Sequence, residues 1–329
     1  MATALSSTGG MSGVMQGYYD KLALETLLPE LRLYNFGEKR PLPKRHGRDV
    51  SWRRWVMPAA TTALTEGTAP SAQAASANMV SALLEQLGYV YGISDVLELT
   101  AIDSQIEEAV RILGKHAALT IDTYIRNAII DGATKYIERI SGNYANTNTR
   151  TTISAVYSAD TACASVVRAA MARLKRLNVP TINGDYILLM DPHSADQLKA
   201  ETATGGWLDV HKYAQPGEIY SGEVGRLFGF RVIEVGTHGT AHDGSVYVGS
   251  SQSTSATSVC AVYNLAFGQG FFGVTEVDGG VKTYVKTENP YDKSDPLNQF
   301  STVGYKWTGT AKILNPSCGV IVPTAVVFD

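Results

Sequence analysis

The sequence predicts a mixed α+β fold, and three observations support this class. Apolar side chains recur about every 3.7 residues from Ile106 to Ala128, which is the period of one face of a long helix. From residue 218 onward the chain consists of short alternating runs separated by glycine, a pattern typical of strands. With 44% hydrophobic and 18% charged residues, the chain has the composition of a folded protein and not of a disordered one.

Length, charge and cysteine content exclude several classes of protein. The 329 residues provide core for one large domain or two ordinary ones. The net charge of −3 excludes both a wholly basic DNA-coating protein and a polyacidic one. The three cysteines, Cys163, Cys260 and Cys318, lack CxxC spacing, which argues against a disulfide scaffold or structural zinc and fits a reducing cytoplasm.

No segment has the features of a signal peptide or a membrane helix. The first twenty residues contain no Lys or Arg, and the longest apolar run near the end, 319–328, is broken by Pro323. A membrane helix requires about 20 apolar residues. We therefore expect a soluble protein that stays where it is made unless it is packaged.

The N-terminal part predicts an arm followed by short helices. Residues 1–17 are mainly small and polar, so we expect a flexible arm there. Residues 18–33 turn apolar, and Pro29 should divide them into two helical pieces. The expected apolar anchors of these pieces are Leu22, Leu24, Leu27, Leu28 and Leu31.

The next segment, 38–54, is strongly basic and predicts a projecting hairpin. It holds seven Lys or Arg against Glu38 and Asp49, a local charge of +5, so the rest of the chain carries about −8 by subtraction from −3. Prolines and Gly47 disfavour a helix. Residues 50–56 are predicted as one strand that 61–65 continue, and the Ala/Ser-rich run 69–77 as the closing loop.

The centre of the chain predicts a strand and then an unusually long helix. Residues 89–99 alternate like a strand. Ser104 with Glu107 forms a capping-box pattern, and Ser141-Gly142 is the expected end of the helix. A helix over these 38 residues would span about 57 Å, which indicates an elongated protein. The polar run 143–152 is a plausible domain boundary.

The remainder predicts an α/β body that becomes rich in strands. Helices are expected at 160–177 and 194–203, with a short buried strand at 185–190 between them. Strands are expected in the runs GFRVIEV, GSVYVG, VCAVYNLAF, GGVKTYVK and STVGYKW. The run 311–327 is predicted as a strand pair broken at Asn315-Pro316.

Motifs that could indicate catalysis or cofactor binding lack the context that such sites need. GQGFFG at 268–273 satisfies GxGxxG, but an alternating run follows it where a dinucleotide site requires a helix, so a turn between strands is the better interpretation. His238, His242 and Asp243 lie between predicted strands and are read as a solvated loop, and His193 as a helix-entry turn. We find no nucleophile motif and no activated thiol, and we therefore expect a protein that is not an enzyme and has no metal or cofactor.

Three interpretations of the basic hairpin compete. Cations interleaved with tryptophans could bind single-stranded nucleic acid by charge and stacking, or the segment could be a solvated charged face. The third is a protein–protein arm whose charge meets the acidic remainder of a neighbouring copy, and we favour it because it uses both halves of the charge asymmetry. The candidate inter-subunit residues are Lys39, Arg40, Lys44, Arg45, Arg48, Trp52, Arg53, Arg54 and Trp55.

Longer stretches of the chain resemble a known family. The run NFGEKRPLPKRHGRDVSWRRWVMPAATTALTE (35–66) resembles the extended loop of tailed-phage major capsid proteins. YVYGISD and TIDTYIRNAIIDG follow it, and GEVGRLFGFRVIEV (222–235) is similar to a segment near the shell-axis domain of these proteins. The resemblance covers the chain from residue 18 to the last strands. More specifically, the chain resembles the group named after coliphage N-four.

The resemblance implies a Hong Kong 97-type coat fold. It places an N-terminal arm at 1–35, an extended loop at 36–76, a peripheral domain with a spine helix at 77–152, an axial domain at 153–290 and return strands of the peripheral domain at 291–329. It also implies that the loop lies over an adjacent subunit and that pentamers and hexamers form an icosahedral shell around double-stranded DNA.

The resemblance also implies partners and a location. The arm is too short to include a cleavable scaffolding segment, so we expect a separate scaffolding protein, with a portal and a decoration protein as further candidate partners. The packaged DNA would be enclosed without sequence-specific binding, and no membrane is involved. The expected location is the virion, after synthesis in the cytoplasm of a bacterial host. No residue pair can be assigned to a covalent cross-link.

Overall fold

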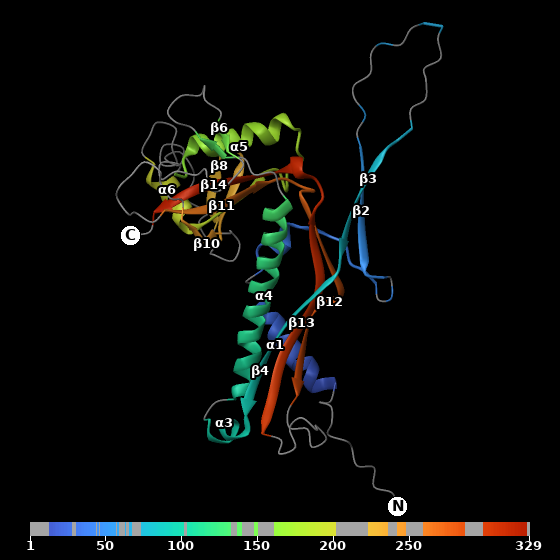
Figure 1. The fold of residues 1–329 in the computed structure, drawn as a ribbon, viewed down its shortest axis with the longest axis vertical. Helices are drawn as coiled ribbons and strands as arrows, with labels where there is room; N and C mark the ends of the chain where they lie inside the picture. The colour runs from blue at the N-terminus through green and yellow to red at the C-terminus, as the bar shows by residue number, and fades with distance from the viewer. Residues whose placement is uncertain are drawn as a thin grey trace, which may run out of the picture.

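The described part of the chain contains two large sheets, each packed against its own helices, and a projecting two-stranded hairpin (Figure 1). The computed structural model describes residues 13–27, 31–43, 45, 47–56, 58, 63, 66–67, 74–101, 104–132, 137–139, 148–150, 161–201, 223–235, 242–247, 259–286 and 299–327. One sheet extends along the long helix, and the other lies in the lobe with the shorter helices α5 and α6.

The long helix predicted from the apolar repeat is α4, Gln105–Gly132. Its buried side includes Val110, Leu113, Ala117, Ile121 and Ile125, none more than 2% exposed. The expected end at Ser141-Gly142 is wrong, because the helix has 28 residues and a length of about 42 Å. Beyond Gly132, Ile137–Arg139 (β5) pairs with Asn148–Arg150 (β6), so strand pairing provides the hydrogen bonds that a longer helix would have provided.

Two helices precede the hairpin, but neither has the predicted bounds. Helix α1 is Gly13–Leu27, so 13–17 are helical and not part of a flexible arm. Helix α2 is Leu33–Phe36, whereas residues 31–32, where the second piece was predicted, are not helical. Residues 1–12, Leu28 and Pro29 lie outside the described residues. Of the expected anchors, Leu22, Leu27 and Leu31 are buried and Leu24 is 41% exposed.

Helix α4 holds this N-terminal segment in place by close packing and by a buried carboxylate. A Cβ on Gly114 would lie 2.7 Å from the Ala23 carbonyl oxygen, so glycine lets α1 approach α4 closely. Asp122, 2% exposed, accepts hydrogen bonds from the backbone N–H groups of Arg32, Leu33 and Tyr34 at 2.7, 3.4 and 3.2 Å. The chain is thereby fixed to α4 just before it enters the hairpin.

The first sheet has the described strand order β1-β12-β13-β4. Its long strands are β4 (Glu85–Ser94), β12 (Phe272–Lys286) and β13 (Phe300–Ile313), all antiparallel, and β1 (Glu38–Lys39) joins β12 in parallel. One face packs on α4, where the Tyr305 hydroxyl lies 2.9 Å from His116 Nδ1 and from Thr120 Oγ1.

The strand expected at 89–99 starts earlier and ends sooner than predicted. It ends at Ser94, whose side chain caps helix α3 (Asp95–Thr100) by accepting a hydrogen bond from the Leu97 N–H.

The second sheet has the described order β10-β11-β7-β9-β8, with β14 also pairing with β11. Its strands are β7 (Tyr186–Met190), β8 (Glu223–Leu227), β9 (Phe230–Glu234), β10 (His242–Tyr247), β11 (Val259–Phe267) and β14 (Gly319–Val327). Helices α5 (Ala164–Arg176) and α6 (Pro192–Ala200) accompany it. The order α5, β7, α6 confirms the predicted helix–strand–helix order. Helix α6 starts at Pro192 because the Asp191 side chain caps it by accepting a hydrogen bond from the His193 N–H.

In its C-terminal half, the chain crosses between the two sheets at two adjacent turns. The first is the turn at 268–271 between β11 and β12, and the second is the short 3₁₀ helix η2 (Pro316–Cys318) between β13 and β14. The N–H groups of Leu314 and Asn315 both donate to the Phe271 carbonyl oxygen, at 2.9 and 3.2 Å, which ties the two crossings together.

These crossings correct two expectations. The two halves of 311–327 are not a strand pair, because β13 pairs with β12 and β4 whereas β14 pairs with β11. In the C-terminal half, sheet membership changes at these two crossings and not at residue 290, since 272–286 belongs to the first sheet and 319–327 to the second.

Candidate functional site

The basic segment forms a projecting hairpin, although with a different second strand from the one expected. Strand β2 (Asp49–Trp55) pairs antiparallel with β3 (Ala77–Leu83), from Asp49 opposite Leu83 to Trp55 opposite Ala77. Residues 61–65 were expected to continue a strand, but Ala63 is not in a strand and the other four residues lie outside the described part of the chain. Residues 69–73 of the expected closing loop also lie outside it. Figure 1 shows the two strands extending away from the sheets.

The beginning of the basic segment does not project. Glu38–Lys39 is β1 at the edge of the first sheet, and the Arg40 and Leu42 N–H groups donate to the carbonyl oxygens of Val274 and Glu276 on β12, at 3.1 and 3.2 Å. Residues 38–42 are therefore part of the sheet, and the free hairpin starts later than the expected boundary at residue 36.

One face of the hairpin base packs onto the body of its own chain. Val50 and Trp52 are 1% and 5% exposed and form a small apolar cluster. The other members of this cluster are Leu42, Val80, Ala82, Leu84, Val277 and Leu314. Trp52 lies against Gly273 of β12, where a Cβ would be 2.9 Å from the indole ring. Trp52 is thus buried within its own subunit, contrary to the expectation that it projects.

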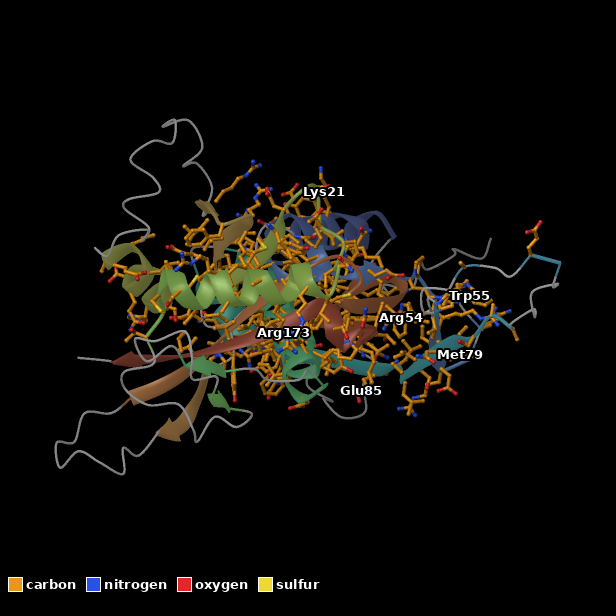
Figure 2. The ribbon with its side chains drawn as sticks, turned by 90° about the horizontal axis from the view of Figure 1, so that it is seen from above. Lys21, Arg54, Trp55, Met79, Glu85 and Arg173 are labelled. Carbon is orange, nitrogen blue, oxygen red and sulfur yellow. The ribbon has the colours of Figure 1, made fainter. Side chains whose placement is uncertain are left out.

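The end of the hairpin exposes apolar and cationic side chains together. Trp55 is 60% exposed and its ring lies under the Arg53 guanidinium, 4.9 Å from the guanidinium carbon. Met79, opposite Arg53 in the register, is 67% exposed, and Val56 is 43% exposed. Figure 2 shows Trp55 and Met79 on the part of the hairpin that lies away from Arg173. We call Arg53, Trp55 and Met79 the hairpin end.

Several of the predicted cations fasten the hairpin to its own chain. The Arg40 guanidinium donates to the Ser51 carbonyl oxygen, and Arg48 Nε donates to the Leu84 carbonyl oxygen at 3.1 Å. Lys39 Nζ lies 4.6 Å from the centre of the Tyr34 ring. The pKa of the Tyr34 phenol is raised, mainly by burial and further by its hydrogen bond to Glu276. These cations therefore position the hairpin.

The structure brings together only part of the predicted set. Arg53, Arg54 and Trp55 lie at the exposed end of β2, Arg45 occupies an exposed turn with φ of 68°, and Lys44 lies outside the described residues. Arg54 is on the face that carries Trp52, near Cys318, where burial raises the pKa of the thiol and the Arg54 charge opposes that rise. Sequence reasoning missed Met79, because its strand was not recognised as the partner of β2.

The motifs weighed for catalysis or cofactor binding lie in ordinary structural positions. GQGFFG is the turn between β11 and β12 followed by a strand, as predicted, with Gly270 at φ 76°. His242 and Asp243 are in β10 and not in a loop, and His238 is outside the described residues. Across the described ranges, no group of three or more His, Cys, Asp or Glu side chains could hold a metal ion. Within the same ranges, the helices are too short or too polar to cross a membrane.

Comparisons with known proteins identify the fold. No family model and no curated protein sequence matches the chain. Solved structures do match. The capsid of cyanophage P-SCSP1u aligns with a TM-score of 0.59 and 17% identity over 87% of this chain and 86% of that chain. The Ralstonia phage GP4 capsid gives 0.61 and 14% over 91% and 92%, and the cyanophage Pam1 capsid gives 0.60 and 14% over 100% and 97%. The chain therefore has the fold of phage capsid proteins.

Proposed function

We propose that this chain is the major capsid protein of a tailed phage, with the Hong Kong 97-type coat fold and a relationship to the coliphage N-four group. The similarity to phage capsid structures over nearly the whole chain carries this proposal, since the alignments leave little of either chain unmatched. The subunits form pentamers and hexamers, and these form an icosahedral shell that encloses double-stranded DNA. The role is structural and involves no catalysis.

The proposed domains follow the two sheets. The peripheral domain comprises α4 as the spine helix with β4, β12 and β13, and the axial domain comprises α5, α6, β7–β11 and β14. The extended loop is the β2–β3 hairpin, whose second strand runs to residue 83. The N-terminal arm leads into α1 and α2. This division moves the boundary expected at residue 290 to the two crossings between the sheets.

The mechanism of assembly is geometric. The hairpin end presents a tryptophan, a methionine and an arginine to solvent, and such residues are typical anchors of protein interfaces. We infer that it binds a different surface of a neighbour, so the contact is head-to-tail and a closed ring results when the rotation between copies closes. In this proposal, the residues of the basic segment that contact a neighbour are Arg53, Arg54 and Trp55, with Arg45 and Lys44 as further candidates.

The alternative, a nucleic-acid-binding hairpin, is not favoured. Stacking on single-stranded nucleic acid needs exposed aromatic rings along a basic groove. Of the two tryptophans only Trp55 is exposed, and Arg40 and Arg48 are bound to backbone carbonyl groups of their own chain. We propose that the DNA is enclosed without sequence-specific binding.

Other partners and the location follow from the proposed role. Assembly uses a separate scaffolding protein, and a portal and a decoration protein are further candidate partners. Synthesis takes place in the cytoplasm of the bacterial host and the mature location is the virion.

The solution mass of the purified chain tests this function. Light scattering followed by electron micrographs of the heavy fraction should show ring-sized oligomers or megadalton shells. Co-expression with candidate scaffolding proteins from the same genome is the second arm. A 35.3 kDa monomer at every salt and protein concentration, in both arms, would contradict the proposal.

A further inference from the structure

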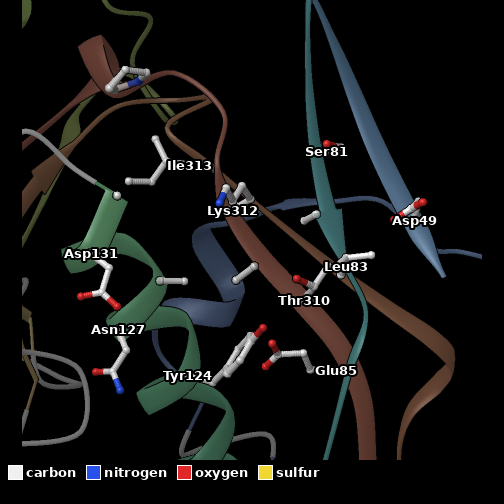
Figure 3. Close-up of a pocket in the computed structure, with 15 residues that line it drawn as sticks. Asp49, Ser81, Leu83, Glu85, Tyr124, Asn127, Asp131, Thr310, Lys312 and Ile313 are labelled. Carbon is white, nitrogen blue, oxygen red and sulfur yellow. The ribbon is translucent and has the colours of Figure 1, made fainter.

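The first sheet has a face covered by helices and an open face. Helices α1 and α4 cover one side, where the Thr283 hydroxyl donates to Asp20 of α1 and the Tyr305 hydroxyl contacts α4. On this side Tyr124 of α4 and Glu85 of β4 point toward one another and hydrogen-bond (Figure 3). Because successive residues of a strand point to opposite sides, the residues between these positions belong to the open face.

Strand register arranges the open face in three rows that run from β12 across β13 to β4. The rows are Lys282, Lys306 and Gly88; Tyr284, Gly304 and Val90; and Lys286, Thr302 and Gly92. We call these nine residues the lysine face. Its three lysines are exposed, and Tyr284 and Val90 are 45% and 64% exposed. No acid is among the nine residues, so the three lysines give the face a positive charge.

Two of these lysines stand directly opposite each other. Lys282 and Lys306 form a pair in the antiparallel register of β12 and β13. The Cβ atoms of such a pair are about 4.5–5.5 Å apart, and like charges in this position destabilise a sheet. Lys286 adds a further positive charge on the same face of β12. An anion that lies over these rows would attract the ammonium groups and offset their repulsion.

The glycines of the face are a second, independent observation. A Cβ on Gly88 or Gly304 would lie 2.7 or 2.9 Å from a backbone carbonyl oxygen of the neighbouring strand, so the pairing of β4 with β13 explains these two. A Cβ on Gly92 would meet nothing within 4 Å. Glycine inside a strand costs about 0.5–1 kcal/mol relative to alanine, and it often marks a place where a ligand approaches the backbone closely. The subunit itself gives no packing reason for Gly92.

We propose that the lysine face binds the phosphate backbone of double-stranded DNA. Duplex DNA is a polyanion with one negative charge for about every 1.7 Å of its axis, so several phosphates can meet the face at once. Lysine provides compact charges on flexible stems, and the Tyr284 hydroxyl can donate a hydrogen bond to a phosphate oxygen. This inference rests on the proposed capsid function and names the surface of the subunit that faces the enclosed DNA.

Phosphate contacts position a protein on DNA and carry no base information. Binding through the lysine face is therefore consistent with enclosure of the DNA without sequence-specific recognition. Because lysine side chains are mobile and exposed, the contact should weaken steeply as salt is added.

The arrangement of the face favours DNA over a protein partner. A protein interface needs a packed apolar core. Tyr284 and Val90 are two strands apart, a separation of about 10 Å, with Gly304 between them. The charges are spread more widely, since Lys282 and Lys286 are about 13 Å apart along β12. The hairpin end of another copy is also unsuited to this face, because it carries a cation itself.

Binding of unassembled subunits to a short duplex of mixed sequence, measured by fluorescence anisotropy, tests the proposal. For wild type, the logarithm of the association constant should fall linearly with the logarithm of the salt concentration between about 50 and 200 mM. The variant Lys282→Gln/Lys286→Gln/Lys306→Gln should bind at least about tenfold more weakly at the lowest salt. Its salt dependence should be shallower by about one unit of slope for each lysine removed.

A matched control removes the same charge from another basic surface. Arg45→Gln/Arg53→Gln/Arg54→Gln replaces three exposed cations of the basic segment and should change the slope by less than about one unit. Thermal unfolding of the unassembled subunits checks the fold. The lysine-face variant should melt no lower than wild type, because it removes the opposition of Lys282 and Lys306.

The outcomes separate this inference from the capsid function. If wild type assembles and the lysine-face variant keeps the wild-type affinity and slope, or the control loses as much, the inference is overturned and the function stands. If DNA binding is unchanged and the lysine-face variant no longer assembles, the face meets an acidic protein segment, which also overturns the inference. If wild type remains monomeric with and without scaffolding protein, the proposed function fails and the inference fails with it.

Discussion

The base and the end of the hairpin each carry a tryptophan, which is buried at the base and exposed at the end. Trp52 and Trp55 are three positions apart on β2 and therefore lie on opposite faces of the strand. Trp52 is 5% exposed and packs on Gly273, whereas Trp55 is 60% exposed and lies under the Arg53 guanidinium. The comparison shows how one strand can be fixed to its own subunit and still offer an apolar surface to another.

The largest effect is expected for Trp52→Ala, which should lower the free energy of unfolding of the unassembled subunit by about 3–5 kcal/mol. The loss arises because the truncation leaves a cavity among Val50, Leu84 and Leu314. Urea denaturation followed by circular dichroism measures it. A loss below about 1 kcal/mol would show that the base of the hairpin is not packed as described.

An intermediate effect is expected for Gly273→Ala, which alters the contact between Trp52 and Gly273 from the β12 side. The new Cβ would lie 2.9 Å from the Trp52 ring and 3.1 Å from Leu314 Cδ1, so the indole must move. The expected cost is about 1–3 kcal/mol in the free energy of unfolding. Gly92→Ala on β4, where a Cβ would meet nothing within 4 Å, is the matched control and should cost less. Equal losses for the two variants would contradict the packing of Trp52 on Gly273.

A smaller, pH-dependent effect is expected at Asp122, which fixes the chain that leads into the hairpin. Burial raises the pKa of this carboxyl above its usual range, although three backbone N–H groups act in the opposite direction. Because the pKa is higher in the folded state, the proton stabilises the fold below about pH 4, and this contribution is lost as pH rises through the raised value.

Comparison with Asp122→Asn isolates this contribution, since the amide does not titrate. The difference in free energy of unfolding, wild type minus variant, should fall as pH rises from about 4. Denaturant titrations at a series of pH values measure the difference. A difference that rises over this range would show that hydrogen bonding and not burial dominates the titration.

The smallest effect on the subunit, and a large one on assembly, is expected for Trp55→Ala. Since the ring is largely exposed, the free energy of unfolding should change by no more than about 0.5 kcal/mol. Assembly should weaken at least about tenfold, as for a central interface residue. The two readouts are denaturation of the monomer and sedimentation of the assembled fraction. A Trp55 variant that assembles normally would remove the hairpin end from the interface.

Much of the fold could be predicted because local patterns specify it. The apolar repeat indicated the face of α4 that is buried, and Asp191 begins α6 by capping it. The predicted end of α4 is wrong because the chain beyond it forms strands at 137–139 and 148–150. These strands depend on their pairing with each other, which the spacing of apolar residues does not indicate. The separation of β13 from β14 likewise depends on which distant strands they meet.

The location of the hairpin could be predicted from the sequence, but not which of its side chains are buried and which are exposed. The charge of 38–54 and its prolines indicated a hairpin, but two tryptophans three residues apart give no sign in sequence of which one meets Gly273. Met79 could not be foreseen, since only the pairing of β2 with β3 places it opposite Arg53. Residue spacing reports neighbours within an element and does not report such pairing.

A cryo-electron microscopy map of the particles formed by the wild-type chain tests the central claim most directly. The account predicts that the hairpin end of each subunit lies on an adjacent copy, with Trp55 covered by that copy and Trp52 still packed on Gly273 of its own subunit. A map in which the hairpin end remains in solvent, or packs on its own subunit, would contradict the account.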